Sequence, residues 1–234
     1  MIKSYKEMPI GIYFNLQALV LSEPDDLEWK VPALALLTGR TEEDLLNAPL
    51  AEFSSLMNQA AFLAKEPETE RVKPVYKAGP FELVPTVDTQ KVTTAQYIDF
   101  QTFCKEKDDA ARVVAVMSCL MVPKGHTYCE GYDVGAVRDA IRDHITVVDA
   151  LSLYGFFFER LLTSIRRSQT FSEKMLKRLE KLPATPRRDR AIARAKKQME
   201  VIRRQEASLR NGAGLQMLTP FQKLAAVLGM RFGV

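Results

Sequence analysis

Four side chains near the middle of the chain come closest to a metal-binding set. His126 and Cys129 stand three residues apart in an expected loop, and Cys119 and Cys104 precede them. A structural zinc site needs about four such ligands within tetrahedral reach. Cys119 stands among apolar residues, where cysteine usually packs as a small hydrophobic side chain. We therefore expect no metal site and no cofactor.

Groups for nucleophilic or acid–base catalysis are equally sparse. A nucleophile needs a neighbouring base, and the base needs a third group to orient it. The chain has two histidines, and it contains neither a Gly-x-Ser-x-Gly turn nor a glycine-rich phosphate loop. Its acidic clusters at 25–26, 42–44 and 108–109 fall at expected helix starts, where the helix dipole favours carboxylates. The sequence thus indicates a protein that is not an enzyme.

The strongest chemical signal is a run of cations near the C-terminus. Residues 1–160 contain 16 Lys/Arg and 24 Asp/Glu, whereas residues 161–234 contain 17 and 5. Such a split predicts that the tail meets something acidic, which could be the body of the chain, another protein or nucleic acid. Because Phe171 is the one aromatic residue in residues 166–204, a merely solvated helix face remains an alternative. The candidate interaction ridge comprises Arg187, Arg188, Arg190, Arg194, Lys196, Lys197, Arg203 and Arg204.

Composition and charge indicate a globular protein of a reducing compartment, the cytoplasm. The 234 residues are 47% hydrophobic, enough for one or two domains with a buried core. Three cysteines are too few for a secreted disulfide scaffold, which favours a reducing compartment. The longest apolar stretch, residues 145–162, is interrupted by Asp149 and Glu159 and falls short of a membrane span. We expect no membrane partner.

Periodicity predicts a mainly helical, all-α protein with one small β-hairpin. The hairpin is expected at residues 75–84, where two short extended runs flank Ala78-Gly79-Pro80. Capping boxes begin helices at Thr41 and Thr93, with Asp44 and Gln96 three residues further on. We divide the chain into an N-terminal helical unit (1–66), a linker with the hairpin (67–92), a helical core domain (93–168) and a basic helical C-terminal tail (169–234).

The basic tail is expected to fold as a helical hairpin. One apolar stripe comprises Phe171, Met175, Leu179 and Leu182, and a second comprises Ile192, Ala195, Met199 and Ile202. A short turn at residues 183–186 joins them, so two narrow stripes can bury each other in an antiparallel pair. The second helix should end at Asn211-Gly212, and Thr219-Pro220 should begin a last amphipathic helix.

The order of several motifs resembles a known family. After the hairpin come Thr93-Thr94-Ala95-Gln96-Tyr97-Ile98-Asp99-Phe100, an apolar helix with Met121-Val122-Pro123, Glu130-Gly131-Tyr132-Asp133-Val134, and Tyr154-Gly155-Phe156-Phe157-Phe158. The N-terminal half adds Ala35-Leu36-Leu37-Thr38-Gly39-Arg40-Thr41-Glu42-Glu43-Asp44. In this order and spacing the chain is similar, over residues 5–165, to proteins of tailed bacteriophages and prophages, especially of Bacteroidetes-type hosts, that resemble tail assembly chaperones.

The resemblance implies a non-enzymatic helper that shields the tape measure protein, or another aggregation-prone tail component, before the tail tube assembles. It carries no catalytic residue to this chain, and the tail beyond Ser168 lies outside it. Two other functions remain open at this point. The chain could be a nucleic-acid-binding accessory protein acting through the basic tail, or a structural component of the virion or its connector. Self-association is compatible with each of them.

Overall fold

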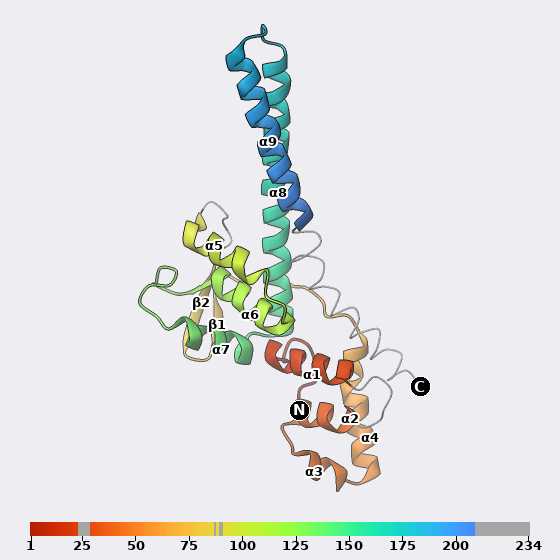
Figure 1. Cartoon of the computed structure of the whole chain (residues 1–234). Coiled ribbons are helices and arrows are strands. Elements are labelled where there is room, and N and C mark those ends of the chain that lie inside the picture. Colours follow the sequence, from red (N-terminus) through yellow and green to blue (C-terminus); the bar gives the residue numbers. More distant parts are fainter. Residues whose placement is uncertain (23–28, 87, 89–90, 209–234) are drawn as a thin grey trace. The chain divides into compact units, whose positions relative to one another are not determined.

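A computed structural model describes residues 1–22, 29–86, 88 and 91–208. These residues form two compact units, Met1–Tyr154 and residues 155–208, and each is described by itself. The mainly helical architecture with a small antiparallel sheet confirms the predicted fold class (Figure 1). No helix in the described ranges is long and apolar enough to cross a membrane. The predicted helix after Thr219 and the helix end at Asn211-Gly212 lie outside the described residues.

The N-terminal helices of the first unit follow local signals in the sequence. They are α1 (Ile10–Ser22), α2 (Lys30–Thr38), α3 (Glu42–Leu46), α4 (Leu50–Gln59) and the 3-10 helix η2 (Ala60–Ala64). Helix α2 ends at Gly39, whose φ of 71° is the left-handed conformation that favours glycine. The capping box at the start of α3 is confirmed, since Thr41 Oγ1 accepts from the Asp44 N–H at 3.1 Å.

The sheet has three antiparallel strands, β1 (Tyr76–Ala78), β2 (Phe81–Pro85) and β3 (Met121–Pro123), in the order β1-β2-β3. The predicted hairpin is thus confirmed, but placing Met121–Pro123 in a helix was wrong. Helix α6 ends at Leu120, and the next three residues pair with β2 so that Leu83 lies opposite Pro123. Three residues are too few to show the alternation of a strand in the sequence. Met121–Pro123 becomes a strand because it pairs with β2, which lies about 40 positions earlier in the chain.

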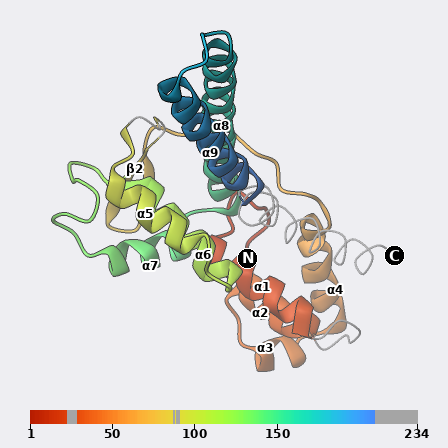
Figure 2. The ribbon, with the colours of Figure 1, turned by 45° about the horizontal axis from the view of Figure 1, so that its top comes forward.

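Three further helices, α5 (Thr94–Phe103), α6 (Asp109–Leu120) and α7 (Val134–His144), complete the core around the sheet (Figures 1 and 2). Their starts match the sequence signals. Thr93 and Gln96 form a reciprocal capping box, while Asp108 and Asp133 accept hydrogen bonds from the first turns of α6 and α7. Each cap satisfies backbone donors that a helix start leaves without partners.

Residues far apart in sequence tie the N-terminal helices to this core. The Ile10 N–H donates to the Ile145 carbonyl and the Val147 N–H donates to the Met8 carbonyl, both at 2.9 Å. Met8, Ile10, Ile145 and Val147 are all buried. The segment expected to be a linker also contacts the unit, since Glu70 N–H donates to Ser152 Oγ at 2.7 Å. Ion pairs of Lys6 with Glu70 and of Lys73 with Asp149 support it.

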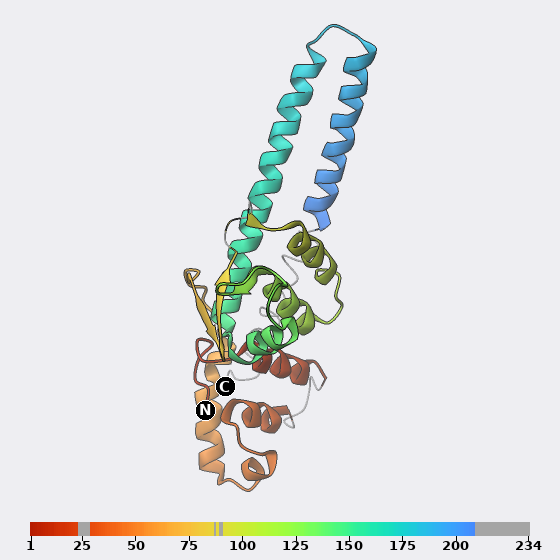
Figure 3. The ribbon, with the colours of Figure 1, turned by 90° about the vertical axis from the view of Figure 1, so that its left-hand side faces the viewer.

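The second unit is an antiparallel helical hairpin. Helix α8 (Val147–Glu180) begins in the first unit, and its part from Gly155 onward pairs with α9 (Pro186–Ser208) (Figure 3). Thr185 caps α9 by accepting from the Arg188 N–H at 3.2 Å, and Pro186 fills the first helical position, where a backbone N–H is not needed. The two helices and the turn between them confirm the predicted hairpin.

The buried seam of this hairpin differs from the predicted one on its first helix. Phe171, Met175 and Leu182 are 66%, 47% and 53% exposed. Side chains spaced four residues apart are displaced around the helix axis at each step, because four residues exceed one turn. Side chains spaced alternately three and four residues apart stay on one face. The half-buried face of α8 follows this alternation and comprises Leu162, Ile165, Gln169, Ser172, Leu176 and Leu179. The stripe predicted on α9 is correct, since Ile192, Ala195, Met199 and Ile202 are all half-buried.

Candidate interaction surfaces

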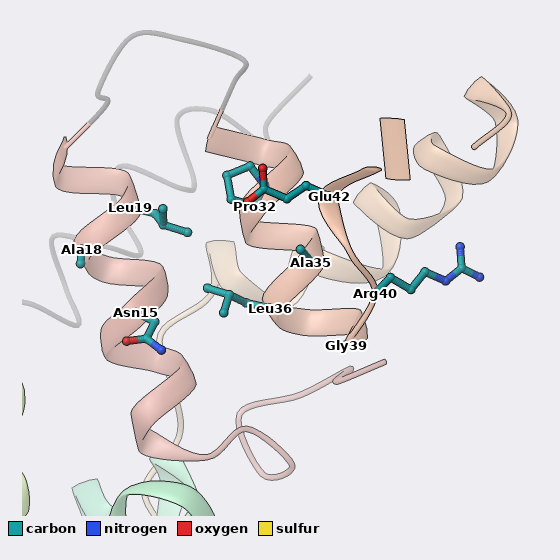
Figure 4. A pocket seen from close by; sticks show the side chains of 9 residues that line it. All are labelled: Asn15, Ala18, Leu19, Pro32, Ala35, Leu36, Gly39, Arg40 and Glu42. Carbon is teal, nitrogen blue, oxygen red and sulfur yellow. The ribbon is translucent and has the colours of Figure 1, made fainter. Parts of the chain in front are cut away.

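An apolar groove lies between α1 and α2 in the first unit (Figure 4). Its volume is about 740 Å³. Each helix contributes residues at i, i+3 and i+4, the positions that share one helical face. Leu19 and Leu36 extend from α1 and α2 toward each other, and Gly39, Arg40 and Glu42 also line the groove. The walls comprise Asn15, Ala18 and Leu19 from α1 and Pro32, Ala35 and Leu36 from α2.

The groove exists because both helices are apolar on more than one face. Their inner faces are buried, as shown by Tyr13, Leu16, Leu34 and Leu37, which are less than 3% exposed. A helix that packs on one side normally carries polar residues on the other. Here the groove-facing positions of both helices are small or aliphatic apart from Asn15, and Leu36 is half-buried. Apolar residues on more than one helical face therefore indicate a second contact.

The chemistry of the groove suits an apolar helix. Such a groove recognises a partner through side chains spaced at i, i+3, i+4 and i+7. Arg40 points away from the groove and pairs with Glu52 at 2.7 Å, so its charge is compensated (Figure 4). Glu42, which begins α3, places a carboxylate at the rim.

The predicted basic ridge is placed along α9. Seven of its eight residues are exposed, and Arg188 is half-buried because it donates to the Leu182 carbonyl at 2.8 Å and pairs with Asp189. The half-buried residues of α9 mark the face that packs on α8. Helical periodicity then gives the position of each ridge residue around the helix relative to that face. Lys196 and Arg203 flank the seam. The face directed away from α8 comprises Arg187, Arg190, Arg194, Lys197 and Arg204, with Val201 among them.

This outward face is a straight cationic line. Its residues recur in steps of three and four, the spacing that keeps side chains on one side of a helix. The line extends about 25 Å at 1.5 Å per residue. No carboxylate interrupts it, although Arg204 pairs with the flanking Glu200. The outward face of α8 is similar, since Arg167, Lys174 and Arg178 surround the exposed Phe171.

Comparison of the chain with protein-family models, with curated proteins and with solved structures finds no match. Function therefore has to be inferred from the geometry and chemistry of these surfaces. The second unit carries 15 Lys/Arg and 6 Asp/Glu in residues 155–208, so it offers charge. The groove offers apolar contact, and it lies in the part of the chain that the resemblance covers.

The residues weighed as a metal site serve other contacts. Burial raises the pKa of Cys119 to about 12 and that of Cys104 to about 11, so both thiols stay protonated at neutral pH. Cys119 Sγ lies 3.3 Å from the hydroxyl of Tyr128, which donates to Asp99 at 2.9 Å. Cys129 is exposed, with a φ of 59°. Within the described ranges, no group of three or more His, Cys, Asp or Glu could hold a metal ion.

Proposed function

We propose that the chain is a non-enzymatic assembly factor that binds an apolar helix of a client protein in the α1–α2 groove. The resemblance to phage tail assembly chaperones suggests the client, a tape measure protein held before tail assembly in the host cytoplasm. The observation that supports this proposal is the groove itself. Two helices that are already packed on their inner faces present a second apolar face.

Mass action explains how such binding helps assembly. A helper that occupies an apolar helix lowers the concentration of free, aggregation-prone client. The aliphatic walls at Leu19 and Leu36 recognise shape and apolarity more than sequence, which suits a long client with many similar helices. We expect co-expression of this chain to raise the soluble yield of the tape measure protein and the two to purify together.

The groove is tested by the substitution Leu36→Glu. A carboxylate in the apolar wall would be desolvated by the client helix, so we expect client affinity to fall by about 2 kcal/mol or more, roughly 30-fold. Affinity is measured by titrating the purified client into the full chain. Ile98→Glu is the matched control because Ile98 is 57% exposed on α5, outside the groove, and should leave affinity unchanged.

A second measurement identifies the occupant directly and does not depend on a charged variant folding. A photo-crosslinking residue in place of Ala35, in the groove wall, should join the client when the two are co-expressed. Crosslinks confined to residues 209–234 of the same chain, or to a second copy, would contradict the proposal. Unchanged client affinity in a folded Leu36→Glu variant would contradict it as well.

A second candidate function is nucleic-acid binding through the outward face of α9. The cationic line supports it, because each phosphate neutralised on duplex DNA adds about 0.9 to the slope of log affinity against log salt. Replacing Arg187, Arg190, Arg194 and Lys197 with glutamine should lower that slope by about 3 to 4. Duplex DNA is titrated at several salt concentrations, and the control set replaces the exposed Lys3, Lys65, Lys77 and Lys105.

Equal slopes in the two glutamine sets would rule out the outward face of α9 as the DNA-binding surface. In that case the Lys and Arg side chains of this face would contact an acidic protein partner or would only be solvated. The third candidate, a structural virion component, is distinguished by stoichiometric presence in purified particles. A chaperone leaves the particle, whereas a structural component stays in it.

A further inference from the structure

A second cleft in the first unit lies among α1, α6, α7 and the end of α5, separate in chemistry from the α1–α2 groove. Its volume is about 420 Å³. Phe14 and Phe103 contribute aromatic rings, while Ala111, Val114 and Ala115 of α6 contribute a low aliphatic wall. Small apolar side chains beside two rings leave space for a compact apolar group.

One arginine in this cleft is held in a fixed position. The guanidinium of Arg138 lies over the Phe103 ring, 4.6 Å from its centroid. Its Nε donates to Ser118 Oγ at 3.2 Å, and the buried Ser118 hydroxyl donates in turn to the Ala115 carbonyl at 2.7 Å. Stacking and this hydrogen bond orient the planar group before any ligand arrives. The two terminal amino groups of Arg138 are then the donors left for a ligand.

Three other charged side chains line the cleft, Glu106, Asp139 and Arg142, and each has a partner of its own. Arg142 pairs with Asp139 at 3.2 Å and with Asp143 at 2.8 Å. Glu106 Oε1 accepts from the backbone N–H groups of Lys107 and Asp108. In contrast, Arg138 has no carboxylate within ion-pair distance among the residues that the structure describes.

We propose that this cleft binds the carboxylate of a small apolar acid, with Arg138 as the group that recognises it. The planar fork of an arginine matches a carboxylate in a bidentate arrangement, and an apolar surrounding strengthens the charge-assisted hydrogen bonds. The apolar part of the ligand lies against Phe14, Phe103 and Val114. A free aliphatic or aromatic acid and the C-terminal carboxylate of a peptide share this chemistry.

The test titrates the full chain with 3-phenylpropionate and with its primary amide, followed by NMR chemical shifts of the cleft residues. The free acid should bind saturably and the amide about tenfold or more weaker, since the neutral amide cannot form the ion-paired hydrogen bonds with Arg138. Arg138→Gln should lose the preference for the acid. Arg138→Lys should keep part of it, because a lysine retains the charge but lacks the fork.

A tripeptide ending in phenylalanine, as the free acid and as the C-terminal amide, distinguishes a peptide terminus from a small acid as the source. Arg71→Gln is the control, since the exposed Arg71 lies outside the cleft and should leave binding unchanged. Equal binding of acid and amide, or an undiminished preference in a folded Arg138→Gln variant, would overturn the assignment. Absence of saturable binding by any of the four probes in millimolar titrations would overturn it too.

Discussion

Replacing Trp29 with alanine is expected to lower the free energy of unfolding of the first unit by about 3–5 kcal/mol. Trp29 is the single tryptophan of the chain, it immediately precedes α2, and it is 1% exposed. Removing a buried indole loses its apolar contacts and leaves a cavity that neighbouring side chains fill incompletely. Because α2 supplies one wall of the apolar groove, the same variant should also lose client binding.

Urea denaturation followed by near-ultraviolet circular dichroism measures this effect. All seven tyrosines lie in residues 5–154, so in the variant the signal reports on the first unit. Leu50→Ala is the control, since Leu50 is 80% exposed, and surface substitutions usually change stability by less than about 0.5 kcal/mol. If Trp29→Ala and Leu50→Ala changed stability equally, the buried position of Trp29 would be wrong.

Met199→Asp is expected to open the helical hairpin, with a loss of about 2–4 kcal/mol of local stability. Met199 lies in the middle of the half-buried face of α9, between Ala195 and Ile202. In proteins most of the stability of a helix comes from tertiary packing of its apolar face, so a charge in the shared seam acts on both helices. Amide hydrogen exchange across residues 171–208 should become roughly 30-fold faster or more.

Phe171→Asp is the matched control because it separates the two possible seams of α8. The sequence pattern placed Phe171 in the seam, whereas the structure leaves it 66% exposed on the outward face. We expect Phe171→Asp to change protection little. Equal loss of protection in both variants would favour the seam expected from the sequence, and rapid exchange throughout the parent would contradict the hairpin.

The hairpin seam also contains a polar contact that fits its register. Gln169 Nε2 donates to Glu206 Oε2 at 2.7 Å, and Arg166 Nε lies 3.8 Å from Glu206 Oε1. A polar pair inside a helical seam is favourable when the two groups face each other and unfavourable when they do not. This contact therefore favours the observed alignment of α8 with α9 over a shifted one.

The sequence by itself determined the features that depend on neighbours three or four residues apart. The caps at Thr41, Thr93 and Thr185 are such features, because the capping side chain and the backbone groups it satisfies lie within one turn. The small hairpin around Gly79 is another, since a short turn fixes its register. Composition likewise located the basic tail.

Only the tertiary structure decided which surfaces face solvent and which residues meet across long distances. Strand β3 forms because Met121–Pro123 finds β2, and the N-terminal segment is fixed because Met8 and Ile10 meet Ile145 and Val147. The Arg138 cleft needs residues from four helices, so no local spacing could indicate it. Local hydrogen bonds and periodicity determine where a helix or strand forms and which of its faces is apolar. Which apolar face remains exposed depends on how the other elements pack against it.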